Sequence, residues 1–136
     1  MLGDCMILVI GFEKEEFSKL KNILSEFKIY GIPEYCRDWV VEEVIEKAPS
    51  FKANSNWHWR KFILMHGIPN EKVKEVMERV RLLGILDVIF ATTTPTSLTW
   101  KLEDLLNELI REDEYFRKLK EEKQKMNTFY LNIRKD

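Results

Sequence analysis

The chain has 136 residues, of which 45% are apolar and 33% are charged, a composition typical of one folded domain and unlike that of a disordered chain or a membrane protein. Its 22 basic and 23 acidic residues nearly cancel, so we expect no general attraction to nucleic acid or to anionic lipid. Lys and Glu are abundant and Gln occurs once, a balance that high growth temperature favours and that predicts a thermophilic source.

An unbroken apolar run over residues 6–10, closed by Gly11, predicts the first strand. Because the run has no polar alternation, we expect this strand to be buried on both faces. Apolar residues at helical spacing over 13–27 predict a helix after it. The apolar run over residues 6–10 is short and follows acidic Asp4, which is unlike a signal peptide. With two cysteines in the chain, we expect a cytoplasmic protein.

A second strand is predicted over residues 32–36. We expect it at an edge of the sheet, because Pro33 cannot donate a hydrogen bond to a neighbouring strand. A helix over 39–47 follows, with Asp38 as its predicted N-cap and Pro49 as its stop. The first part of the chain therefore reads as strand, helix, strand, helix.

The same order of elements recurs in the second part of the chain. The patterns predict a strand over 57–66, a helix over 69–83 and a strand over 88–91. A threonine-rich segment over 92–96 then leads to a long helix over about 99–125.

Matching residues accompany this recurrence. When the first part is shifted by 56 positions, three pairs coincide: Leu8 with Leu64, Gly11 with Gly67 and, after a five-residue insertion, Trp39 with Trp100. We therefore predict one α/β domain over 1–110, built from repeats at about 5–48 and 60–110, with a helical extension and C-terminal tail over 111–136. The alternative, that any two such units share apolar periodicity, stays open.

Two architectures satisfy this pattern. In the first, a four-stranded parallel sheet of order 2-1-3-4 has helices on both faces. In the second, a duplicated ferredoxin-like α+β fold has an antiparallel sheet. The central strands lack polar alternation, so both of their faces need to be covered. This requirement favours the parallel sheet.

Known catalytic and cofactor motifs are missing from the sequence. Its five glycines form neither common phosphate-binding loop, and its Cys and His residues lack metal-ligand spacing. Cys36 and His66 offer a nucleophile and a base, but the expected topologies hold them apart. We also expect Cys5 and Cys36 to be unpaired, because they lie at opposite ends of neighbouring parallel strands. We predict no catalytic residues, no metal and no cofactor; an enzyme stays open, but the residues favour a non-enzymatic protein.

A ligand site is most plausible where the predicted strands end. In a parallel sheet the carboxyl ends of all strands meet at one edge, where open α/β sheets bind their ligands. That edge would carry hydroxyl, guanidinium and imidazole groups, suited to an anion or small molecule: Arg37, His66, Thr92, Thr93, Thr94 and Thr96. The simpler interpretation is that the threonines form a turn and that Thr99 caps the last helix.

The last predicted helix is too long for the sheet. It would span ~40 Å, whereas strands of five or six residues span ~17–20 Å. Its outer part would expose Phe116, Leu119 and Met126, so we expect these residues to form the interface of a homodimer. In the alternative, the chain turns near residues 112–114 and folds back onto its own domain.

Three segments carry a family resemblance. The segment Thr94–Ser97, the Trp100-Lys101-Leu102 motif with the Leu-rich helix after it, and the segment over 62–67 resemble a small prokaryotic family, domain of unknown function 3783. The resemblance covers about residues 60–110. Ser97 and Lys101 stand where the family pattern has Asn and Thr. The resemblance implies that the Thr-Pro-Thr and Trp100 region is the family signature, and it implies no activity.

The sequence thus predicts a non-enzymatic α/β domain that self-associates or binds a protein partner, without nucleic acid or membrane. The alternative function is that of a small-molecule or anion-binding protein that uses the threonine-rich edge.

Overall fold

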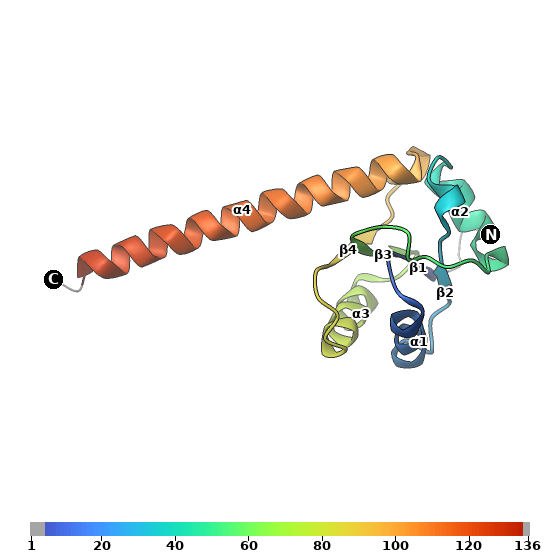
Figure 1. Ribbon diagram of the computed structural model, residues 1–136, viewed down its shortest axis with the longest axis horizontal. Coiled ribbons are helices and arrows are strands. Elements are labelled where there is room, and N and C mark those ends of the chain that lie inside the picture. The colour runs from blue at the N-terminus through green and yellow to red at the C-terminus, as the bar shows by residue number, and fades with distance from the viewer. Residues whose placement is uncertain (1–4, 135–136) are drawn as a thin grey trace.

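Two pairs of helices cover the two faces of a four-stranded sheet in the computed structural model, which describes residues 5–134 and the side chains of residues 5–125 (Figure 1). In chain order the elements are β1 (Met6–Ile10), α1 (Lys14–Ile23), β2 (Ile29–Gly31), α2 (Val41–Lys47), β3 (Lys61–His66), α3 (Asn70–Leu82), β4 (Val88–Thr92) and α4 (Leu102–Arg134). Short 3-10 turns precede α2, follow it, and precede α4.

The strands lie in the order β2-β1-β3-β4, as predicted. The prediction of a purely parallel sheet is wrong, because β1 and β3 pair antiparallel, while β1–β2 and β3–β4 are parallel pairs. For the same reason the sheet is not the antiparallel sheet of the ferredoxin-like alternative. An unbroken apolar run shows that a strand is covered on both faces, and it carries no information on strand direction.

The two parts of the chain meet symmetrically. In the central pair of strands, Leu8 lies opposite Leu64. The flanking pairs, Val9 with Ile63 and Ile7 with Met65, are exchanged by the same shift of 56 positions. A second antiparallel contact joins Val40 and Lys101, the residues just before α2 and α4. The backbone segments at Trp39 and Trp100 flank this contact: Val41 N–H donates to the Trp100 carbonyl and Leu102 N–H to that of Trp39, both at 2.8 Å. Both contacts therefore lie near one approximate twofold axis.

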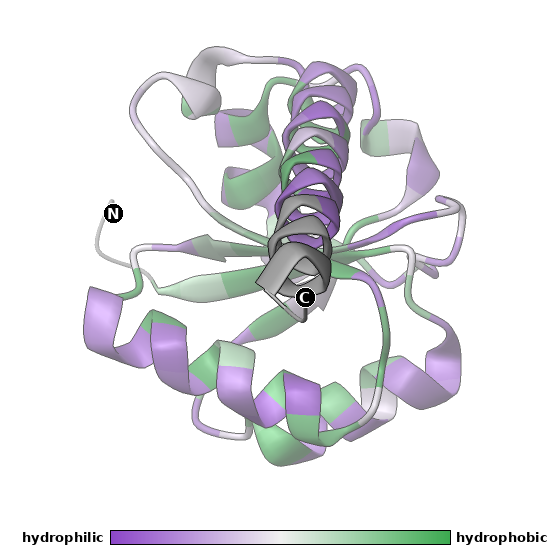
Figure 2. Ribbon diagram, turned by 90° about the vertical axis from the view of Figure 1, so that its left-hand side faces the viewer, coloured by the Kyte–Doolittle hydropathy of each residue, from purple (hydrophilic) through white to green (hydrophobic). Residues whose placement is uncertain are grey.

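Each face of the sheet has its own core. Side chains that alternate along β1 and β3 point to opposite faces, so Leu8 and Leu64 join the core under α2 and α4, while Ile7 and Ile63 join the one under α1 and α3. The helices turn their apolar sides to the sheet and their polar sides outward (Figure 2). All five residues of β1 are buried. This double cover explains the missing polar alternation.

Several predicted element boundaries were wrong in the first half. The second strand lies at Ile29–Gly31, and Glu34–Cys36, which was predicted to be strand, forms a 3-10 turn after Pro33. Helix α2 begins at Val41, with Val40 rather than Asp38 at its N-cap. The third strand starts at Lys61 instead of residue 57. Proline at 33 ends the pairing of β2 earlier than apolar content suggests.

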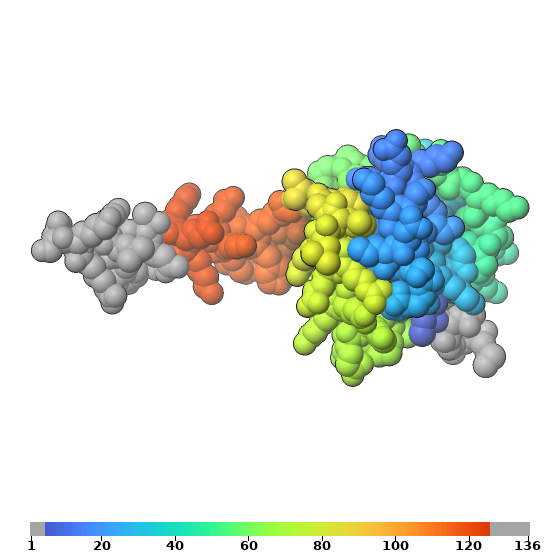
Figure 3. Space-filling view, turned by 90° about the horizontal axis from the view of Figure 1, so that it is seen from below, coloured from blue at the N-terminus to red at the C-terminus, as the bar shows by residue number. Residues whose placement is uncertain are grey.

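Helix α4 runs for 33 residues without a break. It starts over the centre of the sheet, passes the β4 edge and projects from the body of the molecule (Figures 1 and 3). Two ion pairs fix its course where it leaves: Arg60–Asp113 at 2.7 Å and Arg117–Asp87 at 2.9 Å. The fold-back alternative is therefore wrong, since residues 112–114 are helical. Within the described residues, no helix has both the length and the apolar content to cross a bilayer.

Two glycines with positive φ provide a matched test of the backbone. A Cβ at Gly11 (φ +84°) would lie 1.9 Å from the Arg60 carbonyl oxygen, whereas one at Gly84 (φ +75°) would meet nothing within 4 Å. Gly84→Ala is expected to lower the free energy of unfolding by about 1–2 kcal/mol, from strain alone. Gly11→Ala is expected to cost roughly 3–5 kcal/mol, because the Arg60 backbone must also move. Urea unfolding measures both values, and equal costs would contradict this close approach of β1 and β3.

Candidate interaction surface

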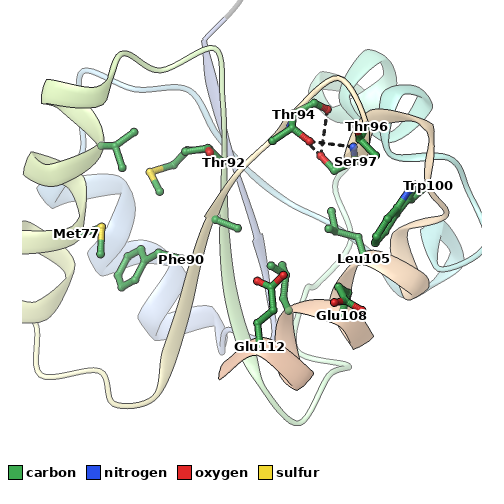
Figure 4. A pocket seen from close by; sticks show the side chains of 14 residues that line it. Met77, Phe90, Thr92, Thr94, Thr96, Ser97, Trp100, Leu105, Glu108 and Glu112 are labelled. Carbon is green, nitrogen blue, oxygen red and sulfur yellow. Dashed lines mark hydrogen bonds between the residues drawn. The ribbon is translucent and has the colours of Figure 1, made fainter. Parts of the chain in front are cut away.

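An open groove of about 490 Å³ lies along the free edge of β4. One wall contains Met77 of α3 and Phe90 of β4, and the opposite wall contains Trp100 and Leu105 (Figure 4). Glu108 and Glu112, both on α4, lie along the same side. The groove is therefore largely apolar, with carboxylates and no basic side chain among its lining residues.

The position of β4 in the sheet leaves this edge open. β4 pairs with β3 on one side, and no described strand pairs with its other side. Its residues Val88, Phe90 and Ala91 are only half-buried. Proteins usually protect an exposed strand edge with charged residues, proline or a covering segment. Since Val88–Thr92 contains neither charge nor proline, this edge is available for contact.

The threonine-rich segment forms the turn that leads into α4. Thr94 N–H donates to Ser97 Oγ at 2.8 Å, and Ser97 N–H donates to Thr94 Oγ1 at 3.0 Å. The Thr99 hydroxyl donates to the Thr96 carbonyl at 2.7 Å. This turn sets Trp100 at the rim of the groove, which Thr92, Thr94 and Thr96 also line. The hydroxyls of Thr94, Ser97 and Thr99 therefore have partners within the turn.

The remaining predicted ligand residues lie outside this groove. Arg37 pairs with Glu103 at 2.9 Å and Glu34 at 3.2 Å, and the hydrogen bond with Glu103 is the main cause that raises the pKa of its guanidinium. His66 Nδ1 lies 2.8 Å from Thr93 Oγ1. Because β1 and β3 pair antiparallel, the carboxyl ends of β1 and β2 lie at one end of the strands, and those of β3 and β4 lie at the other end. Only a parallel sheet would bring all six residues to one end, so the predicted grouping of Arg37 with His66 and the threonines is wrong.

The two cysteines lie in different surroundings. Cys5 is exposed and Cys36 is buried, and both are free, as predicted. Burial raises the pKa of the Cys36 thiol to about 12, so it stays protonated and is a poor nucleophile at neutral pH. No group of three or more His, Cys, Asp or Glu residues is placed to hold a metal ion within the part of the chain that the structure describes.

Exposed apolar side chains lie where α4 leaves the domain. Phe116 is 65% exposed and Leu119 is 41% exposed, and neighbouring Tyr115 is 60% exposed. The side chain of Met126, predicted as part of the same surface, lies outside the described residues. Spacing of four and three places Phe116 and Leu119 on the same side of the helix as Leu109 and Glu112. The exposed residues therefore continue the wall of the groove.

Sequence reasoning missed most of the groove. Met77 lies in the helix predicted over 69–83 and Phe90 in the strand predicted over 88–91, and neither pattern indicates a cavity between them. The signal was present in the predicted strand order, because an order of 2-1-3-4 makes β4 an edge strand. A groove beside an edge strand is a natural place for a partner.

Every residue that lines this groove lies between positions 65 and 112. Residues 61–116 match the family described as Domain of unknown function (DUF3783). The match confirms the resemblance found in the sequence. No curated protein and no solved structure matches the chain. The DUF3783 segment comprises β3, α3, β4 and the first half of α4, so it includes the whole groove and ends at Phe116.

The pH dependence of stability tests the environment of His66. Burial lowers the pKa of His66 below 6.5, and burial followed by Arg37 and Arg60 lowers that of His58. The unfolded chain therefore binds these protons at higher pH than the folded one, and stability is lost as pH falls below about 6.5. We expect the unfolding free energy to drop between about pH 7.5 and pH 5.5, and to drop less in His66→Gln. A rise on acidification, or an NMR titration of His66 above 6.5, would contradict the assignment.

Proposed function

We propose that this protein is a non-enzymatic domain that self-associates through the outer half of α4, residues 114–134, to form a twofold homodimer. The observation that carries the proposal is the exposure of Phe116 and Leu119 on a helix that continues past its own domain. Folded monomers rarely leave such a stripe uncovered. A second copy of the chain supplies an identical stripe, and a twofold contact satisfies both at once.

The length of the unsupported helix favours the same conclusion. Beyond Arg117, which binds Asp87, α4 continues to Arg134. A single helix of this length in water is only marginally stable, and most helices in proteins are stabilised by packing an apolar side. Pairing with another helix supplies that packing.

The polar side chains that could take part in catalysis are already paired with neighbouring residues, which favours a binding role over an enzymatic one. The Arg37 guanidinium is paired with Glu103 and Glu34, and His66 is hydrogen-bonded to Thr93. The alternative function, anion binding at the threonines, finds less support because Glu108 and Glu112 line the same groove. The proposal includes a cytoplasmic location, in which the two free thiols stay reduced.

Charge on the exposed stripe provides the direct test. Phe116→Glu combined with Leu119→Glu places carboxylates on the proposed contact surface and is expected to convert a dimer into a monomer of about 16.3 kDa. The mass is measured by light scattering on a sizing column, and circular dichroism checks that the variant is folded. The matched control, Lys118→Gln with Lys125→Gln, makes the same change in net charge away from the stripe and is expected to remain dimeric. An unmodified chain that is monomeric at micromolar concentration would refute the proposal.

A further inference from the structure

We infer that the α4 helices of the two copies pair antiparallel, with Glu112 of each copy opposite Lys123 of the partner subunit. The inference rests on the proposed self-association and adds its direction and register. It is carried by three observations on α4: a seven-residue repeat, a separation of charge along the helix, and the position of two charged residues within the repeat.

The repeat forms one continuous seam. Its positions alternate in steps of four and three, from the sheet-covering part of the helix to the projecting part: Leu105, Leu109, Glu112, Phe116, Leu119 and Lys123. This is the a/d spacing of a coiled coil. At the wall of the groove, Leu105 is buried in the core under α2 and α4 and Leu109 packs against that core, whereas Glu112, Phe116 and Leu119 are exposed. A partner helix that covers the exposed residues therefore continues along the α4 wall of the groove.

Charge is strongly separated along the same helix. Residues 102–116 contain six acidic residues and one basic residue, whereas residues 117–125 contain five basic and two acidic residues. Parallel pairing would set like charges side by side, and antiparallel pairing sets the acidic part of each copy against the basic part of the other. The helix dipole does not explain the separation, because its effect falls off within the first and last turns.

The two charged positions of the seam fix the register. An antiparallel pairing that sets Phe116 opposite Leu119 of the partner subunit has its centre midway between these residues. Glu112 and Lys123 are equally far from that centre, so the same pairing sets Glu112 opposite Lys123 of the partner subunit. Both are exposed in the single chain. A charged pair at such a seam position selects one register and one direction over others.

The open edge of β4 agrees with this arrangement. The partner helix lies beside Leu109, which is half-buried. It covers the side of the groove that carries the carboxylates and leaves the Arg60–Asp113 contact on α4 in place.

Two single charge reversals test the register. In a Glu112→Lys homodimer the introduced lysine would face Lys123 of the partner subunit, and this repulsive pair would occur twice. In a Lys123→Glu homodimer the introduced glutamate would face Glu112 of the partner subunit, again twice. We expect each variant alone to dimerise at least about tenfold more weakly than the unmodified protein. A mixture restores both opposite-charge pairs, so we expect a 1:1 heterodimer with an affinity near that of the original. Analytical ultracentrifugation of each variant and of the mixture measures this.

A matched control uses Glu114→Lys, which makes the same reversal two positions along and off the seam. It is expected to dimerise normally and not to rescue Lys123→Glu. If both seam variants dimerise like the unmodified chain, or if mixing them restores nothing, the antiparallel register is overturned, while dissociation by Phe116→Glu with Leu119→Glu would still support self-association. If the unmodified chain is itself monomeric, the proposed function fails first.

Discussion

The antiparallel pairing of β1 with β3 is the contact on which the rest of this structure depends. Leu8 faces Leu64 at its centre, and both side chains are fully or almost fully buried. Each edge strand follows its own central strand through a helix and pairs with it in parallel. Because the two central strands run in opposite directions, β2 and β4 end at opposite ends of the sheet.

The same symmetry sets the course of α4. The Val40–Lys101 contact starts the helix over the middle of one face, and the Arg60–Asp113 and Arg117–Asp87 ion pairs fix it as it passes β4. A helix of 33 residues spans about 50 Å at ~1.5 Å per residue, far more than the width of four strands at ~4.8 Å each. The excess length exposes Phe116 and Leu119, the residues on which the proposed self-association rests.

The sequence predicted the features that depend on which residues are buried, and it missed those that depend on the direction of the strands. Strand order and the double cover of β1 and β3 follow from their unbroken apolar runs, and the exposure of Phe116 follows from helix length against sheet width. Strand direction leaves no trace in a short apolar run, so the expected cluster of Arg37 and His66 with the threonines did not form. Long-range pairings such as Arg37–Glu103 depend on topology. The repeat at Glu112 and Lys123 was readable from spacing alone.

A distance between two copies of the chain tests the central claim most directly. A nitroxide label is attached to exposed position 107 through Asn107→Cys, in a Cys5→Ser background where the remaining Cys36 is buried. Pulsed electron paramagnetic resonance then measures the distance between the two labels, which reports the direction of the helices. In the antiparallel register the two labels lie roughly 30–35 Å apart, at ~1.5 Å per residue along the pair and ~10 Å across it. A separation of about 10–15 Å would show parallel helices and contradict the account, and the absence of any dipolar coupling would show that the copies do not associate.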